Sequence, residues 1–110
     1  MPEILLVLTY CPDAATAARI TAALLDQQLA ACVSEGAPVR STYRWQGALE
    51  IAVEIPLQIK CTRERYPLVE QTIRELHPYA VPEIIALPVT AGFGPYLRWV
   101  EDETRPGMVA

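Results

Sequence analysis

The chain has 110 residues, of which 52% are hydrophobic and 20% are charged, and its formal net charge is −4. A length of this order predicts one domain. The acidic balance argues against nucleic acid as a partner, because phosphate binding needs a basic face. The apolar share is high for so small a domain, which favours either a generous core or an apolar surface covered by another subunit.

The N-terminal run at residues 4–9 is apolar but too short to span a membrane, and it has no basic flank or cleavage site. We therefore expect a cytoplasmic protein without membrane contact. Cys11, Cys32 and Cys61 are widely spaced and no Cys-x-x-Cys pair occurs. Neither a disulfide framework nor a structural zinc site is indicated, and Cys32 and Cys61 are interpreted as small buried hydrophobic residues.

Residues 4–9 form a continuous apolar run, which predicts a strand buried on both faces. Pro12 ends it, and Asp13 is a suitable N-cap for an alanine-rich helix over residues 14–28. Residues at helical spacing would form its packing face: Ala17, Ile20, Ala23 and Leu24.

A second apolar run covers residues 29–33, and residues 34–38 interrupt it as a bend or bulge. Strand formers resume at 39–45, Gln46-Gly47 signals a tight turn, and residues 48–62 return as a long strand. Pro56 within that strand predicts a bulge or an edge.

This hairpin is far longer than a usual strand of about five or six residues, so its arms are expected to project beyond the rest of the domain. Apolar side chains occupy both of its faces: Val39, Tyr43, Trp45, Leu49, Ile51 and Val53. Such a hairpin would be unstable alone in water, and pairing with another chain is the expected remedy.

Thr62 is predicted to cap a second helix, with Pro67 in its first turn and His77-Pro78 ending it. Its apolar stripe contains Tyr66, Val69, Ile73 and Leu76. Residues 84–89 then predict a last core strand.

Pro95 suits the first position of a terminal helix that would end near Glu103. The order β-α-β-β-α-β predicts an α+β fold with one antiparallel sheet and two helices on one face. We expect one domain over residues 1–104 and a loose C-terminal tail over 105–110, Met108 to Ala110 above all.

Four motifs together resemble the CutA divalent-cation tolerance family, over about residues 4–100. They are Ala18-Arg19-Ile20 with Leu29-Ala30-Ala31-Cys32-Val33; Ser41-Thr42-Tyr43-Arg44-Trp45-Gln46-Gly47; His77-Pro78-Tyr79-Ala80-Val81-Pro82-Glu83-Ile84-Ile85; and Leu87-Pro88-Val89 with Gly92 and Tyr96-Leu97-Arg98-Trp99. Glu54 and Lys60 also fall where that family has a glutamate and a lysine.

This resemblance implies a ferredoxin-like fold and an interlocked homotrimer, in which sheets of neighbouring subunits pair through the long hairpins. The architecture is also similar to that of the PII signalling proteins. The family is linked to tolerance of divalent metals, and copper binding is associated with some members, so copper is the implied metal. No settled enzymatic activity belongs to the family.

The family's metal-linked pattern combines a cysteine at the end of the first strand with a double histidine before the Pro-Tyr pair. Here Thr9 and Leu76 occupy two of these positions, and His77, the chain's single histidine, carries over directly. Cys11 lies two residues past Thr9, on the same side of a strand, and could substitute. His77 and Cys11 are therefore the candidate metal ligands, although His77 could instead cap its helix.

A second group of candidates is polar or amphipathic: Lys60, Glu54, Tyr79 and Glu83. Lys60 and Glu54 share a strand face only if Pro56 inserts no bulge, and they could then form an ion pair at a subunit interface. Alternatively, the group could line an intersubunit pocket that holds a small anion or carboxylate.

Tyr43 and Trp45 are interpreted as contacts of the trimer interface. Ser34 and Ser41 have no histidine–acid partners in sequence, and no glycine-rich phosphate loop occurs, so catalysis is not indicated. We expect a non-enzymatic trimer that binds a divalent metal, or a small ligand, where subunits meet. The alternative is a PII-like sensor or assembly factor that binds a small metabolite or a protein partner between subunits.

Overall fold

The computed structural model describes residues 3–106, so the predicted loose end at 108–110 lies outside the described residues. Strands and helices alternate largely as predicted. In chain order they are β1 (Ile4–Cys11), α1 (Ala14–Asp26), β2 (Cys32–Glu35), β3 (Val39–Trp45), β4 (Ala48–Thr62), α2 (Tyr66–Leu76), β5 (Ile84–Pro88) and α3 (Gly94–Glu103).

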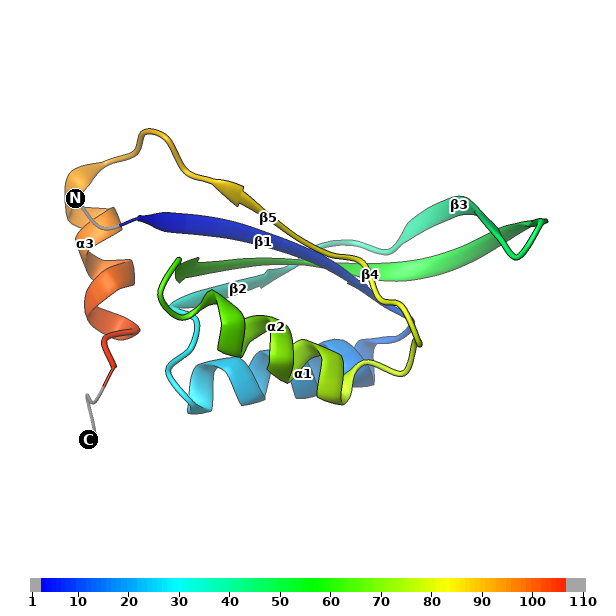
Figure 1. Ribbon diagram of the computed structural model, residues 1–110, viewed down its shortest axis with the longest axis horizontal. Coiled ribbons are helices and arrows are strands. Elements are labelled where there is room, and N and C mark those ends of the chain that lie inside the picture. Colours follow the sequence, from blue (N-terminus) through cyan, green and yellow to red (C-terminus); the bar gives the residue numbers. More distant parts are fainter. Residues whose placement is uncertain (1–2, 107–110) are drawn as a thin grey trace.

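The sheet is built around β4. Its strand order is β2-β4-β1-β5, β3 pairs with the other end of β4, and every pairing is antiparallel. Helices α1 and α2 lie side by side under one face of the sheet, and α3 lies at the end opposite the hairpin (Figure 1). The predicted α+β, ferredoxin-like arrangement is therefore confirmed for the described residues.

The core lies between the sheet and the two helices. Alternate residues of β1 and β4 face α1 and α2, because successive side chains of a strand point to opposite faces. The largest fully buried side chains include Val7, Leu57, Ile59, Ile20, Leu24, Val69 and Ile73. The predicted stripe on the second helix is confirmed, with Tyr66 and Leu76 partly buried against this cluster.

The ends of α1 follow local chemistry. The Asp13 carboxylate accepts a hydrogen bond from the Thr16 backbone amide at 2.7 Å, and this bond holds its pKa below the usual value. The helix ends two residues before the predicted end, because Gln28 adopts a left-handed backbone with φ 56°. The Leu29 amide then donates to the Leu24 carbonyl at 2.9 Å, which closes the last turn.

The predicted cap of the second helix is wrong. Helix α2 begins at Tyr66, and its N-cap is Arg65, which makes no side-chain capping bond. The Thr62 hydroxyl instead accepts a bond from the Arg65 amide at 3.3 Å, in the turn before the helix. Thr62 is the last residue of β4 and is therefore three residues too early to cap α2.

The hairpin is confirmed with its predicted bounds for β3 and β4. Gln46 and Gly47 have φ angles of 50° and 81°. Two consecutive residues with positive φ give the tight turn whose twist matches that of paired strands. The arms extend well beyond the helices (Figure 1), and the molecule measures 44 × 29 × 23 Å along its principal axes.

Pro56 makes no bulge against β1, since the register runs without interruption from Ile4↔Thr62 to Cys11↔Ile55. On the other side of β4, the β2 ladder ends at Leu57 and the β3 ladder begins at Glu54. Pro56 therefore lies in the gap between two partner strands, where its missing N–H breaks no ladder on that side. Gly36 allows the chain between β2 and β3 to pass close to Pro56, because a Cβ at residue 36 would lie 2.9 Å from the Pro56 Cγ.

The last strand is an edge strand rather than the predicted core strand. It pairs only with β1, ends at Pro88, and leaves Ile85 and Leu87 exposed at 47% and 44%. In register these residues lie beside Leu8 and Leu6, on the sheet face opposite α1 and α2. This second face is therefore apolar and largely uncovered within one chain. No helix within residues 3–106 is long and apolar enough to cross a membrane.

Candidate functional site

A cleft of about 600 Å³ begins at the base of the hairpin and extends along β3 as far as Trp45, beside the turn. Three strands and one loop contribute to it: β1, β3, β4 and the segment between α2 and β5. Its lining residues are Tyr10, Ser41, Thr42, Tyr43, Trp45, Glu54, Tyr79, Ala80, Val81 and Glu83.

Strand register explains why these side chains meet. Tyr10 and Glu54 lie on the sheet face opposite the helices, since their neighbours Cys11 and Ile55 belong to the helix-side core. Glu54 pairs with Val39, so every second residue of β3 from Val39 onward shares its face. Ser41, Tyr43 and Trp45 are those residues.

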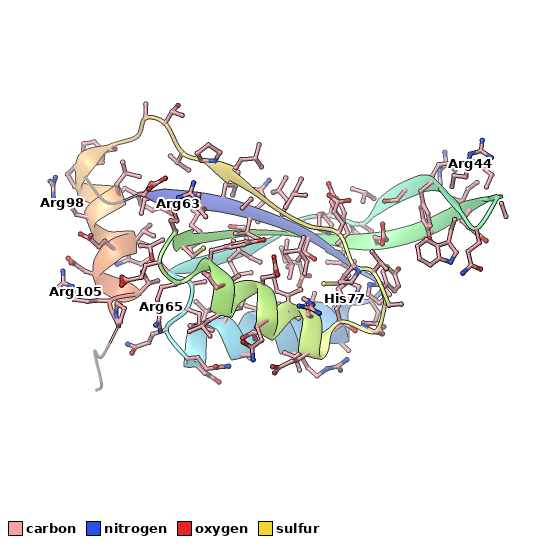
Figure 2. All side chains as sticks on the ribbon, in the orientation of Figure 1. Arg44, Arg63, Arg65, His77, Arg98 and Arg105 are labelled. Atoms are coloured by element: carbon pink, nitrogen blue, oxygen red, sulfur yellow. The ribbon has the colours of Figure 1, made fainter. Side chains whose placement is uncertain are left out.

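His77 anchors the loop that closes one side of the cleft. The Tyr79 backbone amide donates to its Nδ1 at 3.2 Å, and its Nε2 lies 2.7 Å from the Tyr10 carbonyl oxygen. Because Nδ1 accepts, Nε2 must carry the proton and donate, so this is the neutral ring. His77 lies where α2 ends and the loop begins (Figure 2). The imidazole therefore ties this loop to the end of β1.

Glu54 and Tyr79 are joined inside the cleft. Glu54 is only 7% exposed, and its Oε2 accepts a bond from the Tyr79 hydroxyl at 3.2 Å. Burial, followed by the charge of Glu54, raises the pKa of Tyr79 to about 12. The phenol is therefore neutral near pH 7 and can keep donating to the carboxylate.

Lys60 is not among the residues that line this cleft. It shares a face of β4 with Glu54, because Pro56 inserts no bulge, but six residues of strand separate them by about 20 Å. Within one chain the two cannot form an ion pair. Three of the four predicted ligand residues are thus brought together, and the fourth is not. The lining of this cleft in a single chain is acidic, which argues against the small anion or carboxylate that was considered as an alternative.

Comparison with known proteins gives the family. Residues 5–103 match the CutA1 divalent ion tolerance protein family. The chain belongs to this family. A curated relative from Thermus thermophilus, named divalent-cation tolerance protein CutA, is 40% identical over 98 residues, which are 89% of this chain and 95% of the relative.

Solved CutA1 structures have the same fold. One from Shewanella sp. SIB1 is 49% identical, with a TM-score of 0.91 over 94% of this chain and 97% of the other. Another, from Archaeoglobus fulgidus and named a periplasmic divalent cation tolerance protein, is 29% identical, with a TM-score of 0.90 over 93% and 99%.

The predicted metal ligands of this CutA family member have other roles within one chain. Both ring nitrogens of His77 are hydrogen-bonded. Cys11 is fully buried, and burial, followed by the charge of Asp13, raises its pKa to about 11. No three His, Cys, Asp or Glu residues within 3–106 are grouped closely enough to hold a metal ion. Residues 3–106 of one chain therefore do not by themselves fit a metal site, and His77 and Cys11 as ligands stay a prediction.

The hairpin is strongly exposed in a single CutA chain. On the cleft face, Tyr43 and Trp45 are 40% and 44% exposed, and on the opposite face Leu49, Ile51 and Val53 are 65%, 63% and 63% exposed. Sequence reasoning did not select Tyr10 or Val81 as cleft residues. Alternation along β1 could have placed Tyr10 opposite Cys11, but nothing in the sequence shows that the loop before β5 folds back over that strand.

Proposed function

We propose that this chain is a non-enzymatic divalent-cation tolerance protein that acts as a homotrimer and binds its ligand where subunits meet. The observation that carries the proposal is the position of the cleft, which adjoins the exposed apolar strands of the hairpin. If the hairpin buries its apolar side chains against a neighbouring subunit, the cleft beside it lies where the two subunits meet. Relatives named as divalent-cation tolerance proteins support the metal-linked role.

The proposal that the protein is not an enzyme rests on the contacts of its imidazole and on the state of its buried thiols. The single imidazole holds a loop in place by bonds to backbone atoms, and neither of these bonds reaches a serine or cysteine. Burial raises the pKa of Cys11 and of Cys61 to about 11, so neither thiol is an activated nucleophile. Cytoplasmic localisation remains part of the proposal.

A metal such as copper would need donors from more than one subunit. If His77 and Cys11 are among them, the imidazole must release one of its two backbone partners and the thiol must lose its proton. Metal affinity at this position would then rise steeply with pH, because only the thiolate and the free imidazole nitrogen bind metal.

Titration calorimetry of the assembled protein with Cu²⁺ and Zn²⁺, at pH 6.5 and 8.5, tests this role. His77→Gln is the informative variant, since an amide can still donate to the Tyr10 carbonyl but is a poor ligand for copper. We expect the variant to weaken Cu²⁺ binding at least tenfold. Equal affinity of His77→Gln and the parent chain would remove His77 from the ligand set, and Cys11→Ser gives the same test for the thiol.

The second candidate is a PII-like sensor or assembly factor that binds a metabolite or a protein partner in the same place. The size of the cleft favours it, because about 600 Å³ is enough for a small organic molecule. Ligands that bind only the folded protein raise its melting temperature, so a thermal-shift screen over metabolite classes should show saturable stabilisation. A screen without any such response would count against this candidate.

A further inference from the structure

The lining of the cleft at the hairpin base has an unusual balance of charge. It contains two carboxylates, Glu54 and Glu83, and none of its described lining residues is a lysine, arginine or histidine. A polar ligand site usually places groups of complementary charge opposite its ligand. This lining is therefore suited to a ligand that carries positive charge.

Glu54 is the more buried of the two carboxylates in this lining. The residue is 7% exposed, and its Oε2 accepts a hydrogen bond from the Tyr79 hydroxyl, whereas Oε1 accepts none within residues 3–106 and keeps contact with solvent. A carboxylate has about four acceptor positions, so Oε1 can still accept a hydrogen bond or face a charge from a ligand in the cleft. Ion pairs within residues 3–106 join Arg63 to Glu3 and Arg105 to Asp102, so no basic side chain there neutralises Glu54.

Aromatic rings make up the rest of the recognition surface. Tyr10, Tyr43, Trp45 and Tyr79 line the same cleft as Glu54. Ring faces carry partial negative charge, and several rings around one space attract a cation without hydrogen bonds to it. We propose that this cleft binds a small organic cation of the alkylammonium type, with its charge near Glu54 and its alkyl groups against the rings. The inference rests on the proposed ligand site at the seam and specifies its ligand.

The same lining argues against a bare divalent ion at this position. Calcium and magnesium need six or more oxygen ligands, and copper or zinc prefers nitrogen and sulfur. Aromatic carbon would occupy much of the coordination sphere of a metal ion here. An organic cation is weakly hydrated and gains from contact with ring faces, so both parts of the lining would contribute to its binding.

Choline and its neutral isostere 3,3-dimethylbutan-1-ol test the charge requirement directly. The two probes have nearly the same shape and differ by one positive charge. In titrations of the full assembled chain, followed by calorimetry and tryptophan fluorescence, we expect saturable binding of choline and at least tenfold weaker binding of the neutral alcohol, of the order that one desolvated cation–ring contact provides. Succinate, as an anionic probe, should not bind in this cleft.

Variants locate the site. Glu54→Gln keeps an acceptor for the Tyr79 hydroxyl and removes the charge, so choline affinity should fall about tenfold or more. Glu83→Gln removes the other charge of the lining, at an exposed loop residue where the change should not affect folding. This variant therefore tests the site if Glu54→Gln proves unstable. Glu50→Gln is the matched control. Glu50 lies on β4, as Glu54 does, and is exposed, as Glu83 is, but it does not line the cleft.

Two results would overturn the proposal. Equal affinities for choline and the neutral alcohol would show a merely apolar cleft, and no response to either probe would show that the cleft takes no organic cation or that a neighbouring subunit fills it. Copper titration of the same sample separates these failures from failure of the proposed function. A protein that binds copper as a trimer but ignores choline refutes only the organic-cation site.

Discussion

Replacing Ile51 and Val53 by threonine should dissociate the proposed homotrimer while the helix-covered part of each chain stays folded. Both side chains are 63% exposed in the isolated chain, on the hairpin face away from the cleft. Threonine keeps the β-branched shape and the strand preference of the two residues, so the double variant changes polarity with little change in shape.

The size of the effect follows from the exposed surface. Complete burial of a valine or isoleucine side chain stabilises by about 1.5–3 kcal/mol, so burial of the remaining part in an interface would contribute about 1–2 kcal/mol for each side chain. Two residues in three subunits would contribute about 6–12 kcal/mol per trimer. Loss of even half of that lowers the association constant by about two to four orders of magnitude, since each 1.4 kcal/mol is tenfold.

Sedimentation velocity and light scattering over a wide range of protein concentration measure this constant. The parent chain should remain trimeric at low micromolar concentration, and Ile51→Thr/Val53→Thr should become monomeric with the helical bands of its circular-dichroism spectrum unchanged. Leu68→Gln is the matched control, because Leu68 is 44% exposed on α2, away from the hairpin. If the double variant assembles as tightly as the parent, the hairpin does not hold the subunits together and the reasoning is refuted.

Two further predictions concern the cleft and the strand break beside it. Because Tyr79 has a folded pKa of about 12 against an ordinary value of 10.0, the stability from its neutral form is complete below pH 10 and is lost as pH rises from 10 to 12. Denaturant titrations from pH 8 to 11.5 should show a smaller loss for Tyr79→Phe, and parallel losses would contradict the assignment. Gly36→Ala should destabilise by about 1–3 kcal/mol, since the new Cβ would lie 2.9 Å from Pro56 Cγ. An unchanged denaturation midpoint, relative to an Ala37→Ser control, would show that this strand break can relax.

Several parts of the fold could be predicted because their causes are local. The Asp13 cap, the Gln46-Gly47 turn and the buried face of α2 each depend on residues within a few positions along the chain. Predictions that needed information from another segment were less successful. Thr62 was correctly placed at the end of the long strand, but it was also expected to cap the next helix, and nothing in the sequence shows that a turn of three residues separates β4 from α2.

The candidate site divides in the same way. Glu54, Tyr79 and Glu83 were selected as polar outliers among apolar neighbours, and they do line one cleft. Lys60 was selected on the same grounds and lies elsewhere, because the distance along β4 separates residues that share a face. Tyr10 was not selected, since its place in the cleft depends on which strand lies beside the hairpin and on the loop that His77 holds.

The long hairpin shows most clearly what the sequence by itself determined. Alternation, the turn residues and the length of the arms predicted two projecting apolar strands, since these properties depend only on neighbouring positions. The tertiary structure decided that a buried carboxylate at their base and four aromatic rings line one cleft along one face of the hairpin. It did so through strand register and one long-range imidazole bond, whose partners are 67 residues apart in sequence. The pattern of residue types along the chain does not predict such contacts, because they depend on which segments become neighbours in space.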